Sequence, residues 1–390
     1  MEPNYIDLGL VHSVHTSERK ARRACPRRHD WVYNKGYHPP TSHKNLEFGI
    51  AWHVAMETWY DPDMWHKDRD HQLSLAVSAM TTEIDRQLKI YMNYNESVED
   101  SVIEDYDTRM QLGIKMMNYY AERVSPMEDM NLTPLAVEIP FEVELGFRCK
   151  CERCMKLWIQ SPFYLTDFGA NVWASVGEYF KAWSGLPVTF GGRIDAIFQD
   201  SEGRLLCVDW KSAERLMDGE DESAFLQLDD QVAGYTAAMY KLGRPADGFI
   251  YHEQRKAVPQ PPSPLKRPYK GRLFSTDKNA PVEYLTYLKA VSEHDVNAYS
   301  AGLYDEYLQH LQSPMAPKFF ERHTVYKTSV QIENFWRDLI TEARDMIYNP
   351  LDYPTPSRFS CKSCAFRSPC DGKNRGEDYQ YTLDTLYLRN

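Results

Sequence analysis

The stretch RIDAIFQDSEGRLLCVDWK, residues 193–211, decides the fold of this 390-residue chain. Two apolar runs flank a short polar segment that contains glycine, which is the pattern of a β-hairpin. With Gly203 in the left-handed position of a three-residue loop, the register places Asp195 directly opposite Asp209, with Cβ atoms about 4.5–5.5 Å apart. Lys211 lies two residues beyond Asp209 and shares its face. Two carboxylates and a lysine are therefore predicted to meet on one side of a sheet.

Two carboxylates directly opposite one another repel, so the predicted pair requires compensation. A divalent cation supplies it, because Mg²⁺ takes oxygen ligands from one or two carboxylates together with substrate phosphate. Lys211 would then stabilise charge or orient an attacking water molecule. Asp-x-Lys alone is more typical of a solvent-facing salt bridge. The opposed Asp195 leaves the metal-site and salt-bridge interpretations evenly balanced.

Hydrophobic periodicity predicts the other elements of the chain. Helices are predicted at 46–60, 69–95, 100–124, 224–242, 281–312 and 329–348, and further strands at 135–145 and 248–258. Residues 259–272 (PQPPSPLKRPYKGR) are predicted to form a loop, because proline neither donates to a strand ladder nor continues a helix. Residues 353–370 are expected to be irregular for the same reason. The order predicts an α/β fold, with a mixed β-sheet flanked by helices, a helical N-terminal part and a C-terminal cysteine-cluster segment.

Composition narrows the class of protein. With 43% hydrophobic and 26% charged residues the chain has an ordinary globular composition, which excludes disorder and collagen. No run approaches the roughly 18 apolar residues of a membrane span, and the first residues lack the pattern of a secretion signal. Eight cysteines are too few for a disulfide scaffold of this length. We therefore expect a cytoplasmic protein with no membrane partner.

Charge is distributed unevenly along the chain. The 45 basic and 56 acidic residues give a net charge of −11, which alone argues against a nucleic-acid partner. Basic residues nevertheless gather without acidic ones in 19–28 and 255–272, whereas acidic residues gather in 96–107 and 218–222. A charge run is most often a solvated face. Two local cationic surfaces are still compatible with phosphate binding, because local charge matters more than the total.

The cysteines fall into groups. A C-x2-C-x5-C group near the C-terminus consists of Cys361, Cys364 and Cys370. A C-x-C-x2-C group in the middle of the chain consists of Cys149, Cys151 and Cys154. Two cysteines, Cys25 and Cys207, stand alone. Neighbouring thiolates favour a soft metal or a cluster, and a closed site needs four ligands. The C-terminal group is one ligand short, so its partner must come from elsewhere. Cys207, in an apolar strand, is predicted to be a core residue.

Short motifs in the chain together resemble those of the PD-(D/E)XK nuclease superfamily. They are Gly49-x3-His53 on a predicted helix, Gly192-Arg193-Ile194-Asp195 and Asp209-Trp210-Lys211 on the hairpin, and Gln231-x3-Tyr235 on the helix that follows. Ile194 stands where many members have proline, which is a common variation. The layout of Cys25 before the motifs and C-x2-C-x5-C after them is similar to the RecB-like branch with an iron–sulfur cluster. That branch includes the AddB nuclease domain, CRISPR-associated RecB-like exonucleases and phage-encoded relatives.

The resemblance implies a restriction-endonuclease-like core and a role for each motif. The catalytic residues would be Asp195, Asp209 and Lys211. The ligands of one or two Mg²⁺ or Mn²⁺ ions would be His53, Asp195, Asp209 and the backbone carbonyl of Trp210, with Glu138 as a weaker candidate. The ligands of a [4Fe–4S] cluster would be Cys25, Cys361, Cys364 and Cys370. The residues that contact DNA would be Gln231, Tyr235 and, in the basic loop, Lys266, Arg267, Lys270 and Arg272, with Tyr269 for stacking.

Simpler interpretations stay open for several of these residues. A lone histidine on an apolar helix is more often a core residue than a ligand, which applies to His53. Polar residues four apart, such as Gln231 and Tyr235, are common on any exposed helix face. The group Cys149, Cys151 and Cys154 has no counterpart in the family pattern. It would either bind Zn²⁺ with an unidentified fourth ligand or simply decorate a hairpin.

These motifs divide the chain into five predicted segments. They are an N-terminal segment with the first cluster cysteine (1–45), a helical region carrying His53 (46–130), the nuclease core with a Cys-rich insert at 147–158 (131–255), a basic loop with a helical region (256–350) and the iron–sulfur segment (351–390). The expected function is metal-dependent hydrolysis of DNA phosphodiesters by an exonuclease of recombination, repair or phage DNA processing. Its substrate would be single-stranded DNA or DNA with free ends, in the cytoplasm of a bacterium or of a phage host.

The sequence contains no Walker A motif, so any helicase or recombination partner would be a separate protein. Two alternatives to the expected function remain. One is a catalytically silent DNA-binding or assembly protein on a nuclease fold. The other is a nuclease whose four-cysteine site holds zinc, because four thiolates suit either metal centre.

Overall fold

The computed structural model describes residues 9–39, 44–65, 67–94, 98–160, 185–217 and 224–389. A mixed sheet at its centre has the strand order β1-β4-β5-β6-β9, and β3 joins it by pairing with β4. The strands are β1 (His12–Val14), β3 (Leu132–Cys149), β4 (Leu186–Asp200), β5 (Leu205–Ala213), β6 (Gly248–Arg255) and β9 (Phe320–Val325). The predicted α/β fold with a mixed sheet is confirmed. β9 is a strand that the sequence analysis missed.

The β4–β5 hairpin forms in the predicted register. Residues 196–199 pair with residues 205–208, and Gly203 has the left-handed φ of 81° that the turn requires. The pairing ends there, so β4 and β5 separate just before Asp195 and Asp209. The predicted ladder instead continues through these two carboxylates. The separation is the structural basis of the candidate site.

The two edges of β4 are occupied differently. β3 pairs antiparallel with β4 over its whole length, from Leu186 to Asp200. On the other edge, residues 188–190 pair with β1 and residues 196–199 pair with β5. A strand has only two edges, and among the described strands residues 191–195 have no partner on the second one. β1 and β5 thus leave a gap in the sheet at the middle of β4.

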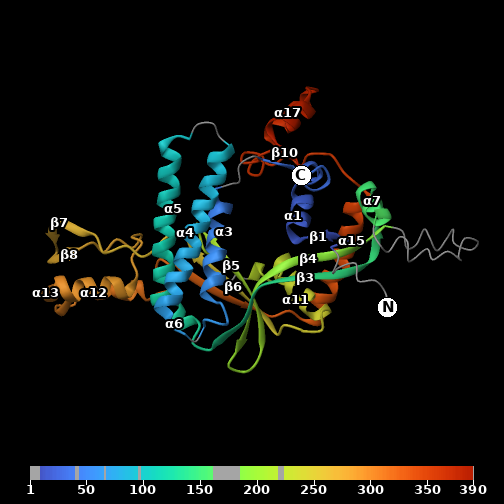
Figure 1. Ribbon diagram of the computed structural model, residues 1–390. Helices are drawn as coiled ribbons and strands as arrows, with labels where there is room; N and C mark the ends of the chain where they lie inside the picture. Colours follow the sequence, from blue (N-terminus) through green and yellow to red (C-terminus); the bar gives the residue numbers. More distant parts are fainter. Residues whose placement is uncertain are drawn as a thin grey trace, which may run out of the picture.

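One face of the sheet is covered by a helical layer (Figure 1). It consists of α3 (Lys44–Trp59), α4 (Arg69–Tyr94) and α5 (Asp100–Tyr119), which continues through the π-helical turn η2 (Tyr120–Val124) into α6 (Ser125–Glu128). Aromatic residues fill the space against the sheet, where Trp52, Trp59, Tyr60 and Tyr120 pack with Trp210 of β5. The helices predicted at 46–60, 69–95 and 100–124 are confirmed.

A second helical layer packs on the other face. It contains α1 (Thr16–Ala24), α7 (Glu152–Gln160), α11 (Asp230–Lys241) and α15 (Ser329–Tyr348). α11 is the crossover helix between the parallel strands β5 and β6. It begins later than predicted, at Asp230, because the Asp229 carboxylate accepts from the backbone N–H groups of Gln231 and Val232 and caps the helix there. Cys207 is fully buried in this layer, as predicted.

The prediction of a loop over 259–272 is wrong in part. Residues Pro264–Tyr269 form β7 and Arg272–Phe274 form β8, a separate two-stranded hairpin. Lys270 and Gly271 connect them with φ values of 49° and 78°, the pattern of a tight two-residue hairpin turn. The prolines are tolerated because this short hairpin has free edges where a proline needs no ladder donor. The basic residues are therefore held on a hairpin rather than on an irregular loop.

The helix predicted over 281–312 is interrupted. The structure has α12 (Tyr284–His294), α13 (Val296–Ser300) and α14 (Asp305–Leu311) instead. Gly302 adopts a φ of 72°, which ends the helical path before α14. The prediction of a helix at 329–348 is confirmed by α15.

The two ends of the described chain pack against each other. The N-terminal elements are α2 (Pro26–His29), the π-helical turn η1 (Asp30–Asn34) and β2 (Tyr37–His38), and the C-terminal ones are α16 (Arg367–Arg375), α17 (Tyr379–Leu386) and β10 (Leu388–Arg389). β10 pairs with β2. Trp31 and Tyr37 share a small core with Phe366 and Leu383. The tail is irregular from 351 until α16, whose start at Arg367 lies inside the segment predicted to lack regular structure.

Half of the basic residues in the block 19–28 are buried in the fold. Arg19, Arg22 and Arg27 are buried, and they form ion pairs with acidic residues of α15 and of the segment after it. Arg19 Nε lies 2.6 Å from Glu342 Oε2, and Arg22 Nη2 lies 3.1 Å from Asp345 Oδ2. The buried arginines of this block are therefore neutralised within the fold, whereas Lys20, Arg23 and Arg28 stay exposed and are the part of the block that remains open to a phosphate. No helix in the described part of the chain is long and apolar enough to cross a membrane.

Candidate active site

The gap beside β4 opens into a pocket of about 300 Å³. Gly191 and Gly192 form its β4 wall, the first turn of α1 forms another, and Gln231 and Tyr235 of α11 close it. His15, just before α1, is fixed by a 2.8 Å hydrogen bond between its Nδ1 and the carbonyl oxygen of Gly191. The pocket therefore lies next to the motif residues of both β4 and α11.

Three metal-ligating side chains meet beside this pocket. His53 comes from α3, Glu138 from β3 and Asp195 from β4, and one ligand atom from each lies within 4.8 Å of the other two. His53 Nδ1 is 3.3 Å from Asp195 Oδ2. Three different elements of the fold thus present a histidine and two carboxylates to one point.

Glu138 reaches this point through an unusual backbone conformation. Its neighbours Val137 and Ile139 pair with Ala196 and Ile194, so Glu138 lies opposite Asp195 on β3. Its φ is 50°, a left-handed value that costs a non-glycine residue about 1–3 kcal/mol. Arg193 Nη1 donates to the Glu138 carboxylate at 3.0 Å. Glu138 is only a weaker candidate in the sequence, because its strand pattern alone does not reveal this alignment.

A second group is built around Asp209 on β5. The Asp209 side chain is completely buried and accepts from Lys211 Nζ at 2.8 Å and from Gln231 Nε2 at 2.6 Å. Gln231 Nε2 also lies 3.0 Å from the Tyr235 hydroxyl oxygen. The predicted pairs Asp209–Lys211 and Gln231–Tyr235 are therefore connected, although they come from different elements.

Trp210 links the two groups through its backbone. Its N–H donates to Asp195 Oδ2 at 2.9 Å, while His53 is hydrogen-bonded to the same residue's backbone. Its indole ring is fully buried and stacks on Tyr60 at 5.5 Å, which fixes the strand at this position. His53, Asp195, Asp209 and the Trp210 backbone are thus neighbours, as the motif residues should be. Asp209 is nevertheless held by Lys211 and Gln231 and does not join the group of His53, Glu138 and Asp195.

Electrostatics at the site favour binding of a cation. Burial and the charge of Asp209 raise the pKa of Asp195 well above its usual range. Burial lowers the pKa of His53 to about 4, and the charge of Lys211 adds to this, so its imidazole is neutral and able to bind metal at pH 7. Burial acts to lower the pKa of Lys211, but Asp209 and Asp195 outweigh it and the pKa lies above the usual value. A divalent cation would relieve the repulsion between the carboxylates.

The C-terminal cysteines lie near Cys25, as the resemblance implied. Burial raises the pKa of Cys364, and the nearby thiols of Cys25 and Cys361 raise it further. Arg27 Nη1 donates to Cys370 Sγ at 3.4 Å. In the described part of the chain the four sulfurs do not form a group lying within 4.8 Å of one another, as the ligands of a single small ion would.

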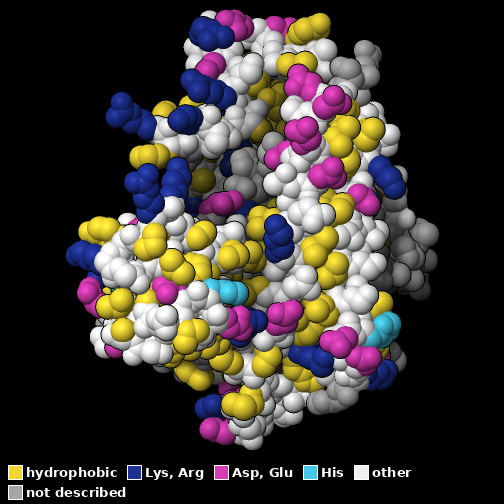
Figure 2. Space-filling model, turned by 90° about the vertical axis from the view of Figure 1, so that its left-hand side faces the viewer, with side chains coloured by type: hydrophobic (Ala, Val, Ile, Leu, Met, Phe, Trp, Pro, Cys, Tyr) yellow, Lys and Arg dark blue, Asp and Glu magenta, His cyan; other side chains and the backbone are white. Residues whose placement is uncertain are grey.

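The basic hairpin β7–β8 projects beyond α4 and α5, next to α12 (Figure 1). Lys266, Arg267 and Lys270 are exposed on it, as is Tyr269, whereas Arg272 is half-buried. Figure 2 shows this side of the molecule, where basic and acidic side chains gather on opposite sides of the upper half. The overall negative charge is therefore not uniform over the surface.

A family model for the PD-(D/E)XK nuclease superfamily matches residues 16–371. The chain belongs to this superfamily. The match includes His53, the β4–β5 hairpin and α11, which meet around one gap in the sheet. No curated protein matches the chain. PD-(D/E)XK proteins use divalent metal ions, and the chain is accordingly a metal-dependent nuclease in the general sense of the family.

The residues present fit such an ion. Mg²⁺ and Mn²⁺ prefer carboxylate oxygens, and a neutral imidazole is a metal ligand as well. Asp195 and Glu138 supply the oxygens and His53 the nitrogen, all within 4.8 Å. His12 is a candidate ligand that the sequence analysis missed entirely: it lies with Cys149, Cys151 and Cys154. Nothing in the local pattern could reveal it, because 137 residues separate it from the first of these cysteines.

Proposed function

We propose that the chain is a Mg²⁺- or Mn²⁺-dependent deoxyribonuclease that degrades DNA from its ends. The observation that carries this proposal is the alignment of Glu138, Asp195 and Asp209 on three neighbouring strands beside an open pocket. Two of these carboxylates meet a neutral histidine and the third contacts a lysine. This combination suits phosphodiester hydrolysis better than it suits a salt bridge, because three carboxylates face two cationic side chains, Lys211 and Arg193, and a neutral His53.

The protein side chains divide the work. His53, Glu138 and Asp195 would hold the metal ion, with the Trp210 carbonyl and Asp209 alongside. When bound, the ion lowers the pKa of a water molecule and stabilises charge on the phosphoryl and leaving oxygens. Lys211 stays protonated between its carboxylates and offers its charge to the phosphate.

Gln231 sets the position of the second group. The Gln231 amide donates to the Asp209 carboxylate and also lies within hydrogen-bond distance of the Tyr235 hydroxyl. The Gln231 side chain therefore orients both Asp209 and Tyr235. Tyr235 lines the pocket together with residues of α1, among them the exposed Lys20. The Lys20 ammonium lies 3.3 Å from Asp229 and would also meet a phosphate in the pocket. A pocket of about 300 Å³ is small beside a duplex and suits a single strand or a frayed end. Lys266, Arg267, Lys270 and Arg272 on the β7–β8 hairpin would guide the strand by phosphate contact.

A [4Fe–4S] cluster bound by Cys25, Cys361, Cys364 and Cys370 is part of the proposal. One observation supports it: these cysteines come from the two segments that pack together through Trp31 and Phe366. The cluster would join the chain ends. Iron in protein purified without oxygen supports it, and zinc bound by these four thiols would overturn it.

End-labelled DNA tests the activity. Linear single-stranded and duplex DNA should be degraded with Mg²⁺ or Mn²⁺ and left intact with EDTA, while circular single-stranded DNA should survive if the enzyme needs an end. Asp209→Ala should abolish cleavage, and Asp107→Asn, which alters an exposed carboxylate on α5, should not. Cutting by Asp209→Ala at the wild-type rate would sink the mechanism. DNA binding without any cleavage by the wild type would instead support a silent binding protein.

An enzyme with such an activity would act in recombination, repair or phage DNA processing. Degradation of single strands in the cytoplasm would require another protein, such as a helicase, to separate duplex DNA first. Addition of a helicase to a duplex substrate should then increase degradation, whereas equal rates with and without it would remove this part of the proposal.

A further inference from the structure

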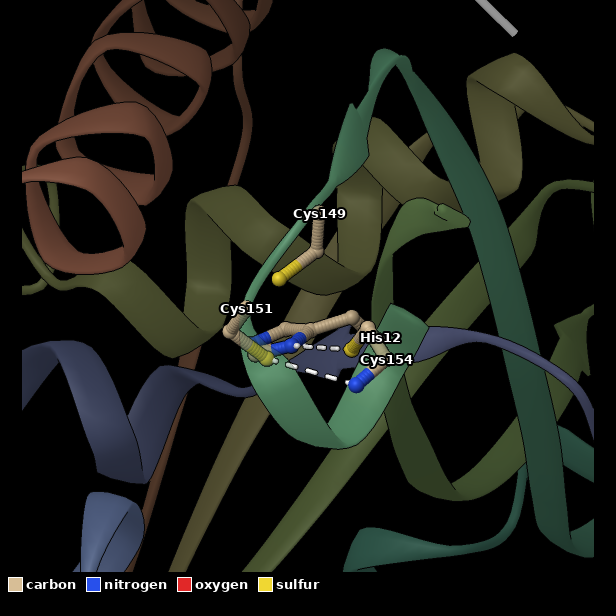
Figure 3. A group of neighbouring side chains, drawn as sticks. All are labelled: His12, Cys149, Cys151 and Cys154. Atoms are coloured by element: carbon tan, nitrogen blue, oxygen red, sulfur yellow. Dashed lines mark hydrogen bonds between the residues drawn. The ribbon is translucent and has the colours of Figure 1, made fainter. Parts of the chain in front are cut away.

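Four metal-ligating side chains meet at the end of the sheet remote from the candidate active site. His12 lies on β1, Cys149 is the last residue of β3, Cys151 follows it, and Cys154 lies in the first turn of α7. Figure 3 shows these side chains gathered between β1, the end of β3 and α7. Cys149 and Cys154 are buried, His12 is half-buried and Cys151 is exposed. A histidine from one strand thus closes a group of three thiols from a distant segment.

The distances suit a single ion. One ligand atom from each residue lies within 4.8 Å of all the others. His12 Nδ1 is 3.4 Å from Cys154 Sγ. In a tetrahedral site, Zn–N and Zn–S bonds of about 2.0 and 2.3 Å separate nitrogen from sulfur by about 3.5 Å and two sulfurs by about 3.8 Å. The four atoms therefore need only small shifts to surround a zinc ion.

The surrounding backbone is also shaped for this group. The Cys154 N–H points to Cys151 Sγ at 3.5 Å, the kind of contact that supports a metal-bound thiolate. Gly185, just before β4, has a φ of 93° and lies against the backbone of Cys149. A Cβ atom at position 185 would lie only 2.2 Å from the Cys149 carbonyl oxygen. Only glycine allows β4 to approach the cysteine turn this closely.

We propose that His12, Cys149, Cys151 and Cys154 bind one structural Zn²⁺ ion. Three thiolates and one imidazole are a donor set of closed zinc sites, and four protein ligands leave no open position for catalysis. The ion neutralises thiolates that are otherwise crowded together in a largely buried place. This site is distinct from the four-cysteine set of Cys25 and the tail, and it does not depend on the proposed nuclease function.

The zinc site is also distinct from the catalytic centre. His12 pairs with Val188, and Asp195 lies seven residues farther along β4. At about 3.3 Å per residue the two positions are about 23 Å apart along the strand. A metal ion at His12 cannot therefore take part in chemistry at Asp195, and its role is to hold the fold.

The part of the fold that a zinc ion would stabilise is β1. β1 is only three residues long and, among the described strands, pairs only with β4, so its own hydrogen bonds attach it weakly. The chain then runs directly into α1, whose first turn forms a wall of the pocket beside Gln231. Zinc would fix β1 to β3 and α7 and thereby fix the start of α1 at the pocket. Loss of the ion should loosen this wall as well as lower stability.

Metal analysis of the purified full chain tests the proposal. Elemental analysis of the wild type should find one zinc ion per chain. The Cys361→Ser variant should retain this ion, because Cys361 belongs to the separate group of cysteines in the C-terminal tail. Cys151→Ser, at an exposed position, and His12→Ala should each lose that zinc while remaining folded by circular dichroism. Reloading with Co²⁺ should give the intense sulfur-to-cobalt absorption of thiolate coordination and the visible bands of tetrahedral Co²⁺.

One further variant keeps the test decisive if His12→Ala or Cys151→Ser fails to fold. His12→Cys should retain the ion with four thiolates and increase the sulfur-to-cobalt absorption over the wild type. Wild-type protein that takes up no zinc and gives no such absorption would overturn the proposal. So would a His12→Ala variant with unchanged zinc content and an unchanged cobalt spectrum, or a disulfide between Cys149 and Cys154 in protein purified under reducing conditions.

Discussion

Glu138 lies opposite Asp195 across β3 and β4, and it adopts a left-handed backbone conformation to bring its carboxylate there. Strain of this kind persists where the surrounding structure over-determines it, and it gathers at functional sites. We expect Glu138→Gln to lower the cleavage rate by at least about 100-fold, since even the outer partners of a metal cost about 10–100-fold when removed. Initial rates on labelled single-stranded DNA at saturating Mg²⁺ would measure this.

The same position separates strain from catalysis. Glu138→Gly removes the carboxylate but accepts the left-handed φ, so activity should fall as in Glu138→Gln while the free energy of unfolding changes by less than about 1 kcal/mol. Glu202→Gln, at the exposed tip of the hairpin, is the control and should keep wild-type activity. A Glu138→Gln enzyme within about 3-fold of the wild type would remove Glu138 from the metal site.

Gln231 connects Asp209 to Tyr235, and its replacement should disturb both. Gln231→Leu keeps the side-chain size but removes the amide that donates to Asp209 at 2.6 Å. One lost hydrogen bond to a charged group corresponds to about 1.5–3 kcal/mol, or roughly 10–150-fold in rate. The loss should appear mainly in kcat, because Asp209 is misplaced.

Tyr235→Phe is the matched comparison for Gln231→Leu. It removes only the hydroxyl that contacts Gln231 and should raise KM more than it lowers kcat. Gln309→Leu, on an exposed face of α14, should change neither constant. Equal kcat values for Gln231→Leu and the wild type would show that the amide does not position the carboxylate.

The parts of the site that sequence analysis found are those set by local geometry. The hairpin fixes Asp195, Asp209 and Lys211 within 17 residues, so turn length and strand alternation were enough to align them. Helical spacing likewise placed Gln231 and Tyr235 on one face. The separation of β4 from β5 just before the carboxylates escaped prediction, because it depends on β1 occupying the rest of the same edge.

The failures share a long-range cause. The block 19–28 is cationic throughout in sequence, yet Glu342 and Asp345, more than 300 residues away, neutralise its buried arginines Arg19 and Arg22 in the fold. His12 joins cysteines that follow it by 137 residues or more. Charge patterns and ligand spacings describe neighbours in sequence only. Tertiary packing decides whether a basic residue meets solvent or a carboxylate.

Arg19 should accordingly behave as a structural residue. Its side chain is completely buried, 2.6 Å from Glu342, with its guanidinium over the Phe335 ring at 4.9 Å. Removal of one partner from a buried pair costs about 3–5 kcal/mol, and Glu342 is partly exposed, so Arg19→Met should cost about 3 kcal/mol. Arg86→Met, which breaks an exposed pair with Glu83, should cost less than about 1 kcal/mol. Urea unfolding of the two variants gives the comparison, and equal values would contradict it.

The β7–β8 hairpin should affect binding instead of stability. Lys266 and Arg267 are exposed, and each phosphate contact contributes about 0.7 to the salt dependence of single-strand binding. Lys266→Ser combined with Arg267→Ser should therefore reduce the slope of log K against log salt by up to about 1.4. Binding is measured in EDTA to prevent cleavage. Lys289→Ser, on α12 beside the hairpin, is the control, and an unchanged slope in the double variant would exclude the hairpin from the DNA path.

His252 should make the fold sensitive to acid. Burial lowers its pKa well below the usual value, and the charge of Arg322 adds to this. Its ring is enclosed by Tyr120 and Phe320, with Arg322 Nη2 at 3.4 Å from Nδ1. The unfolded chain therefore binds a proton near pH 6.5 that the folded chain rejects. Stability is full above that pH and falls as the pH decreases through it, by at most about 1.4 kcal/mol per pH unit.

Replacement of His252 by glutamine isolates this effect. His252→Gln cannot titrate, so its free energy of unfolding should fall less steeply between pH 7 and pH 5 than that of the wild type, even if the variant is less stable throughout. Urea unfolding at several pH values without added Mg²⁺ provides the two profiles. Contributions of His53 and of the cysteine site occur in both proteins and cancel in the difference. Parallel profiles would mean that His252 takes up a proton in the folded protein, which a ring buried beside Arg322 should not do.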